Sequence, residues 1–194
     1  MITELSTIKD GVGATELNGA TSVFVKGSKA YVVSNSDDSL SIFDITDPAM
    51  ITELGTIKDT VGATELSGAA SVFVKGNKAY VASNNDNSLS VFNITDPTMI
   101  TELGTIKDGV GATQLGGAYS VFVKGNKAYI ASSGDNSLSV FNIRKPSSIK
   151  ELTTIVDGIG ATELNGAYSV FVKGNKAYTT SISDNALSVF NLRK

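Results

Sequence analysis

The chain has 194 residues and a formal net charge of −3, and it is 41% hydrophobic and 18% charged, which is apolar enough to bury a core. It contains no histidine and no cysteine, which excludes Ser-His and Cys-His nucleophiles, imidazole acid–base chemistry and the usual zinc sites. The charge balance gives no general attraction to nucleic acid, and no apolar run approaches the roughly 18 residues of a membrane helix. We therefore expect a globular protein that is not an enzyme and has no cofactor, bound metal, nucleic-acid partner or membrane insertion.

The chain is an internal repeat. The motif ITEL at residues 2, 51 and 100, with the variant IKEL at 149, recurs every 49 residues. The copies are residues 2–50, 51–99, 100–148 and 149–194, and the last copy is three positions short. The second and third copies differ at 11 of 49 positions, which indicates recent duplication or deliberate design. Each copy buries its faces only against its neighbours, so we treat residues 1–194 as a single repeat domain.

Each copy predicts four strands joined by distinct turns. In the second copy the strands are residues 71–75, 78–83, 88–94 and 100–106. Gly76-Asn77 joins the first two strands, with Gly first as a type II′ turn requires. The polar turn 84–87 leads to the third strand, and a turn containing Pro97 leads to the fourth. A longer connection, residues 107–117, reaches the next copy.

The strand pattern favours one all-β architecture. Four antiparallel strands per copy, at a period of about 40–50 residues, are typical of a β-propeller blade. Three of the strands are apolar on both faces, as expected for sheets packed between neighbouring sheets. The alternative is a β-solenoid, whose coils are usually shorter and whose parallel strands lack tight hairpins. We therefore predict a β-propeller of four-stranded antiparallel blades, with the two phenylalanines of each copy filling the blade interfaces.

A known family shares this pattern. The segment SVFVKGNKAYVASNNDNSLSVFNITDP resembles the LVIVD-type repeat of bacterial and archaeal β-propellers. The shared features are a Gly hairpin before an A-Y-V-A strand, a later strand ending in Asp or Asn and then Ile, and a polar turn with Pro. The last copy departs from the pattern, with TTS at 179–181 and no Pro turn. The resemblance implies a propeller, commonly on secreted or surface proteins, and it implies no reaction.

The ends of the chain divide one blade. The chain begins on a fourth strand, residues 2–8, and ends on a third strand, residues 186–192. The N-terminal strand can complete the last blade by backbone hydrogen bonds, whereas an unpaired third strand would be an exposed sheet edge. Two closures are open: a four-bladed ring of one chain, or an eight-bladed ring of two chains that exchange these strands. We expect the two-chain ring, because near-identical blade interfaces make head-to-tail joining easy.

Two repeated positions hold candidate ligand or partner contacts. They are Tyr119 and Tyr168, at the start of the first strand where other copies have Thr21 and Ala70, and Glu16, Glu65, Gln114 and Glu163, in the long connection. Tyrosine is common in recognition surfaces, and paired carboxylates occur in glycosidases. The structural interpretations are packing at the channel mouth for the tyrosines and solvated loop residues for the connection. These carboxylates repeat because the blade repeats, so a glycosidase is not favoured.

Other motifs have structural interpretations. The second turns carry Asp37-Asp38, Asp86, Asp135 and Asp184, which could suggest calcium. No copy has the alternating carboxylates of a calcium loop, so we interpret these residues as turn caps. The Gly-rich segment 11–15 lacks the helix and lysine that follow a phosphate-binding loop.

Basic and acidic residues are concentrated in turns at opposite ends of the strands. In an up-and-down blade the first and third turns lie at one face of the ring, and the second turn and the connection lie at the other. The first turns carry eight of the 16 basic residues, and the second turns and connections carry 12 of the 19 acidic residues. We therefore expect a basic face and an acidic face, with three lysines beside the connections offsetting part of the acidic charge.

These features favour a non-catalytic interaction module or structural scaffold, as part of a surface protein or as a minimal or engineered propeller. The alternative is a small-ligand or glycan-binding, lectin-like propeller with repeated sites. Tyr119 and Tyr168 recur in only two copies, which weakens that alternative. Low charge and abundant Ser, Thr and Asn slightly favour an extracellular setting.

Overall fold

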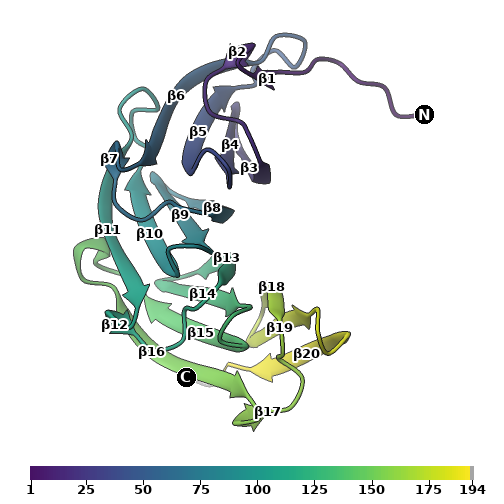
Figure 1. The fold of residues 1–194 in the computed structure, drawn as a ribbon. Helices are drawn as coiled ribbons and strands as arrows, with labels where there is room; N and C mark the ends of the chain where they lie inside the picture. Colours follow the sequence, from purple (N-terminus) through teal and green to yellow (C-terminus); the bar gives the residue numbers. More distant parts are fainter. Residues whose placement is uncertain (193–194) are drawn as a thin grey trace.

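The structure, a computed structural model, describes residues 1–192, and four β-sheets follow one another along an open arc (Figure 1). The first sheet contains β3 (Ala20–Lys26), β4 (Lys29–Ser34), β5 (Ser39–Asp44), β6 (Thr52–Asp59) and β7 (Gly62–Ala63). The second contains β8 (Ala69–Lys75), β9 (Lys78–Ser83), β10 (Ser88–Asn93), β11 (Thr101–Asp108) and β12 (Gly111–Ala112). The third contains β13 (Ala118–Lys124), β14 (Lys127–Ser132), β15 (Ser137–Asn142), β16 (Lys150–Asp157) and β17 (Gly160–Ala161). The fourth contains β18 (Ala167–Lys173), β19 (Lys176–Ser181) and β20 (Ala186–Asn191). A short pair, β1 (Lys9–Asp10) and β2 (Gly13–Ala14), precedes them, and the single-turn 3-10 helix η1 (Pro146–Ser148) lies between β15 and β16.

Two kinds of turn position the strands. The first hairpin loop begins with Gly at positive φ, as at Gly76 with φ 60°, while Asn77 is not at positive φ. This confirms the type II′ interpretation. The second turn ends with Asp or Asn in the left-handed region, as at Asn87 with φ 55°. Short polar side chains tolerate this region because they bond to nearby backbone groups.

Each of the first three sheets has a fifth strand that the sequence analysis did not predict. In the second sheet β12 pairs in parallel with the end of β11, with Lys107 opposite Gly111. The turn between them contains Gly109 at φ 69°, and Gly111 is at φ 88°. The Gly-rich connection therefore folds back onto the strand that it leaves, and the four-strand description of the blade was incomplete.

The core lies between neighbouring sheets, with one continuous apolar cluster at each of the three boundaries. Phe92 and Phe141 are fully buried there, and Phe190 packs against the third cluster while partly exposed, so these three confirm the predicted interface position. Phe43 is also buried, but in a smaller cluster that joins the first sheet to Ile8 and Ala14. The other four, Phe24, Phe73, Phe122 and Phe171, form a row along the inner strands with ring centroids 4.9–5.0 Å apart. They contact one another across the boundaries but remain partly exposed, because the inner strands border the open side of the arc.

Residues 1–8 form no strand, and the first of them extend away from the sheets (Figure 1). Nearer to β1, the hydroxyl of Ser6 donates to the carbonyl oxygen of Pro48 at 2.7 Å, and Ile8 packs beside Phe43. The equivalent segments of the later copies are β6, β11 and β16, and each of these pairs with the strand that precedes it in the chain. Residues 2–8 have no preceding strand, so the expected strand is absent from the single chain. Within the described residues the last sheet is therefore three-stranded, and β20 has one unpaired edge.

Candidate functional site

Tyr119 and Tyr168 are each the extra residue of a β-bulge. The register of β13 against β14 shifts between Ala118 and Ser120, so Tyr119 has no partner directly opposite, and the same shift occurs at Tyr168. The two rings stack, with centroids 4.0 Å apart and an interplanar angle of 31°. The hydrogen bond to Tyr168 raises the pKa of Tyr119 above its ordinary value of 10.0. A bulged residue is not fixed by a cross-strand neighbour, which explains why this position varies between copies.

Glu16 and Glu65 form ion pairs. Oε2 of Glu16 lies 2.7 Å from Nζ of Lys58, and Oε2 of Glu65 lies 2.7 Å from Nζ of Lys107. The two glutamate side chains are only 23% and 20% exposed, so their interpretation as solvated loop residues was wrong. The hydrogen bond to the carboxylate raises the pKa of Lys58 and of Lys107 above 10.5.

The backbone of the same connection position anchors the connection to its own blade. The carbonyl oxygen of Glu65 accepts hydrogen bonds from the hydroxyls of Ser83, Ser88 and Ser90 at 3.2–3.3 Å. The carbonyl oxygens of Glu16, Gln114 and Glu163 accept equivalent bonds from serines of their blades. The position is therefore structural in all four copies, whatever its side chain does.

The ion pair is not present in every copy. Val156 stands where the first two sheets have lysine, and Gln114 stands where they have glutamate. Both members have therefore changed together in the third sheet. In the last copy Glu163 is exposed and has no ion pair within residues 1–192. The 49-residue spacing makes Lys9, at the other end of the chain, the counterpart of the two paired lysines.

Two recurring polar contacts join neighbouring sheets: a Thr–Glu contact at the first two boundaries, and an Asp or Asn contact to glycine at all three. Thr64 donates from its backbone N–H and its Oγ1 to the carboxylate of Glu102 at 3.0–3.2 Å. The side-chain oxygen of Asn87 accepts a hydrogen bond from the backbone N–H of Gly117 at 2.7 Å. The equivalents between sheets are Thr113–Glu151, Asp38–Gly68 and Asn136–Gly166. Thr15–Glu53 makes the same contact between the segment after β2 and the first sheet. Sequence reasoning missed these residues, although their recurrence at one position of each copy was a usable signal.

The two ends of the arc expose surfaces that are buried at the inner boundaries. Val23 of the first sheet is 63% exposed, whereas its equivalent Val72 is 5% exposed. Leu187 of the last sheet is 68% exposed, whereas its equivalent Leu89 is fully buried. The surface around Val23 corresponds to the side of a sheet that packs against the preceding sheet. The surface around Leu187 corresponds to the side that packs against the following sheet. The two ends are therefore complementary to each other.

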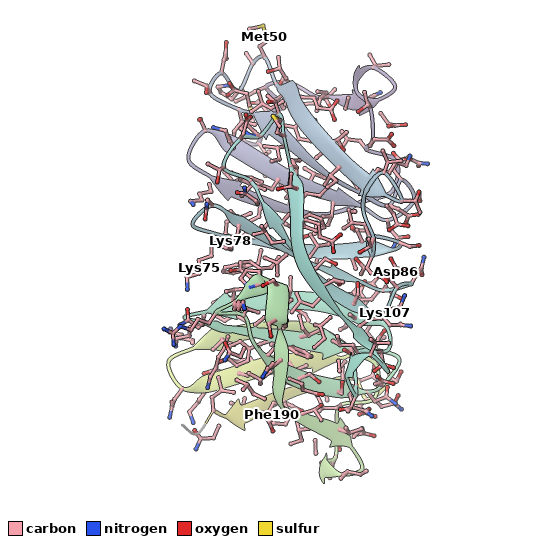
Figure 2. All side chains as sticks on the ribbon, turned by 90° about the vertical axis from the view of Figure 1, so that its left-hand side faces the viewer. Met50, Lys75, Lys78, Asp86, Lys107 and Phe190 are labelled. Atoms are coloured by element: carbon pink, nitrogen blue, oxygen red, sulfur yellow. The ribbon has the colours of Figure 1, made fainter. Side chains whose placement is uncertain are left out.

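The first and second turns lie on opposite faces of the molecule, as expected. Figure 2 shows Lys75 and Lys78 on one side of the molecule, and Asp86 and Lys107 on the other. Burial raises the pKa of Asp86 above its ordinary value of 3.8. Within residues 1–192 no three acidic side chains gather closely enough to hold a metal ion, and no helix is long and apolar enough to cross a bilayer.

Comparison with solved structures shows the same fold at low sequence identity. The computationally designed Ika4 protein has a TM-score of 0.69 at 13% identity, with 100% of both chains covered. The β-propeller domain of Cps50 (Swd1) from Myceliophteria thermophila has a TM-score of 0.66 at 11% identity, and hydrazine synthase from Kuenenia stuttgartiensis has 0.70 at 17%. The matches cover 90% and 96% of this chain but only 54% and 50% of those two, so the chain spans about half their length.

Sequence comparison identifies the repeat itself. No curated protein matches the chain significantly. The family model of the LVIVD repeat matches residues 19–59, 68–108 and 115–157, which together make up more than half of the chain. These segments contain the four antiparallel strands of each of the first three sheets with their turns, and the all-β, propeller-like arrangement agrees with the match. The chain belongs to the LVIVD repeat family.

Proposed function

We propose that the chain is a non-catalytic propeller that acts as an interaction module or structural scaffold. One observation carries the proposal: the repeated polar groups hold connections to their own blade and join neighbouring blades. Glu65 pairs with Lys107, and Glu102 binds Thr64. Groups committed to such contacts are poor acids, bases or nucleophiles, and the two charged faces remain for partners. The proposal would be contradicted if the protein catalysed a reaction, and if Glu65→Gln abolished that catalysis without changing the melting temperature.

We propose further that the working form is a closed ring, in which residues 2–8 supply the outer strand of the last blade. The support is the unpaired edge of β20, together with the sequence of residues 2–8, which matches that of the outer strands. The match to about half of the Cps50 propeller domain supports a ring of more than four blades. Closure removes the exposed edge and both exposed end surfaces at once.

Deletion of residues 2–8 tests closure. We expect aggregation or a clearly lower melting temperature, because the edge of β20 and the apolar end surfaces would stay exposed. A matched control carries residues 2–8 in shuffled order, which keeps the chain length and removes the strand pattern. If the deletion changes neither the melting temperature nor the number of chains per particle, residues 2–8 do not close the ring.

The stacked pair of Tyr119 and Tyr168 favours a second candidate function, a glycan-binding or small-ligand-binding propeller. Tyr119→Ala and Tyr168→Thr introduce residues that the first two copies already carry at this position, so the fold should tolerate them. Binding on a glycan array that disappears in this double variant, with no change in melting temperature, would support the alternative. Array signals that are absent or equal in both proteins would contradict it.

A further inference from the structure

We infer that a second copy of the chain completes the ring, so that two chains form an eight-bladed ring through two identical junctions. The inference rests on the closure proposed above. It adds which chain supplies the closing strand and which residues meet at the junction. Three independent features support a second copy: the equal steps between sheets, the repeat spacing of the junction residues, and a hollow beside β20.

The three inner boundaries have equal geometry. The Asp or Asn contact to glycine measures 2.7, 2.7 and 2.8 Å at the three boundaries. The backbone nitrogen of the threonine lies 3.0 Å from the glutamate oxygen at the first two boundaries, and Thr15 makes the same contact to Glu53 at the free end of the first sheet. Sheets joined by the same contacts are related by the same rotation. In a four-bladed ring each step would be a quarter turn and the first and last sheets would meet. The arc is open and both end surfaces are exposed (Figure 1), so equal steps require further blades, and a second chain supplies four.

The repeat spacing assigns partners to the residues at the ends. The contacts between sheets join residues 38 apart for Thr and Glu, and 30 apart for Asn and Gly. When the 49-residue repeat is continued from the end of one chain into the start of a second chain, the same spacings pair Thr162 with Glu4 of the second chain. They also pair Asn185 with Gly19 of the second chain. All four are of the residue types that make the inner contacts. Asn185 already has φ 54°, the conformation in which Asn87 holds the glycine N–H of the following sheet.

The ion pair gives the same assignment. Its members are 42 residues apart, which pairs Glu163 with Lys9 of the next copy. In the third sheet both members are lost together, as Gln114 and Val156. Glu163 and Lys9 both keep their charges, although each is exposed in the single chain. An ion pair between Glu163 of one chain and Lys9 of the next would explain why both residues have kept their charges.

A hollow of about 460 Å³ lies where the incoming strand would pack. It is bordered by Val140 and Phe190, between the third sheet and β20. The first two inner clusters include an isoleucine from just before the outer strand, Ile100 and Ile149 respectively, and no such residue packs against the third cluster within the described chain. The repeat makes Ile2 their counterpart, and Ile2 is fully exposed. The hollow therefore fits Ile2 of a second copy.

Charge-reversed variants distinguish a second copy from the same chain. Lys9→Glu alone and Glu163→Lys alone each place like charges at both junctions of a two-chain ring. In an equimolar mixture of the two variants, both junctions regain opposite charges. By size-exclusion chromatography with light scattering, we expect the unmodified protein at twice the 20.1 kDa chain mass. Self-association of each variant should weaken by about tenfold or more, and mixing should restore it.

Lys58→Glu is the matched control, because it breaks the equivalent ion pair inside the first sheet. It should lower stability without weakening self-association, and mixing should not rescue it.

A 20.1 kDa particle whose melting temperature falls in both single variants and recovers in the Lys9→Glu/Glu163→Lys double variant would mean closure within one chain. That result overturns the second copy and leaves closure intact. A 20.1 kDa particle that none of these variants affects overturns closure as well. A dimer insensitive to both single variants overturns the assigned junction.

Discussion

The side-chain oxygen of Asn136 accepts a hydrogen bond from the backbone N–H of Gly166 at 2.8 Å, across the boundary between the third and fourth sheets. Asn136 also ends a hairpin turn, with φ 53° in the left-handed region. One residue thus shapes a turn within its own blade and binds the next blade. The same double role recurs at Asp38 and Asn87, so the turns are part of the interface between blades.

Asn136→Ala should destabilise the protein by about 1–3 kcal/mol, because alanine is strained at this φ and the Gly166 N–H loses its acceptor. Asn136→Asp is the matched control, since Asp38 makes the same bond in the first sheet. Urea unfolding of both variants measures the difference. Equal unfolding free energies for the two variants would show that the bond to Gly166 contributes nothing.

Phe92→Ala should cost about 3–5 kcal/mol of unfolding free energy, because the ring is fully buried between the first and second sheets. Val110→Ala serves as the control, because Val110 is an exposed side chain of the connection and should change stability little. Denaturant unfolding checks both values. A loss below about 1 kcal/mol for Phe92→Ala would place the ring outside the cooperative core.

The sequence was sufficient for the four antiparallel strands of each blade because the repeat, the Gly-Asn hairpins and the doubly apolar strands are local signals, but it did not indicate the parallel fifth strand. It was not sufficient for contacts that depend on how one blade meets the next. Thr64 looked like an ordinary loop residue, and its bond to Glu102 spans 38 residues. Glu65 was interpreted as solvated because nothing in its segment shows that Lys107 returns to it. The strand expected at residues 2–8 depends on a partner edge, which no local pattern provides.

Thr179→Val should stabilise the protein by about 1–3 kcal/mol. Thr179 is completely buried and its hydroxyl has no hydrogen-bond partner among residues 1–192, whereas its equivalents in the other copies are Val32, Val81 and Ile130. Valine keeps the shape and removes the orphaned hydroxyl. Thr179→Ser keeps the hydroxyl and loses the methyl group, so that control should be no more stable than the native protein. The melting temperature and urea midpoint measure both, and a destabilised Thr179→Val would mean that the hydroxyl has a partner.

Stability should fall as the pH rises above about 10. Burial raises the pKa of Tyr80 above 10.0, so the unfolded chain loses this proton at a lower pH than the folded chain, and folding becomes less favourable in that window. The ion pair raises the pKa of Lys107 above 10.5, so its stabilisation is complete below that pH and is lost as the lysine of the folded protein deprotonates. Both effects have the same sign. Tyr80→Phe should lose less stability between about pH 9 and pH 11 than the native protein, and an equal loss would exclude the tyrosine contribution.

The basic face should bind polyanions although the net charge of the chain is −3. The third turn of the third blade increases the positive charge of this face, because Arg144 and Lys145 replace the Thr-Asp of the second copy. Arg144, Lys75 and Lys78 line a hollow of about 240 Å³, and none of the described residues that line it carries a carboxylate. Charges gathered on one face produce a local positive potential that the net charge does not reveal. We expect retention on immobilised heparin at low salt, with elution at moderate salt.

Substitution on each face tests whether this binding follows the face or the net charge. Lys78→Ser with Lys127→Ser removes two positive charges from the basic face and should lower the salt concentration needed for elution. Val61→Asp with Val110→Asp makes the same change in net charge at two exposed positions of the connections, on the acidic side. This control should elute close to the native protein, because opposite faces are separated by more than the Debye length of roughly 10 Å at 0.1 M salt. If the two double variants shift equally, binding depends on net charge, and the division into two faces has no consequence for anionic partners.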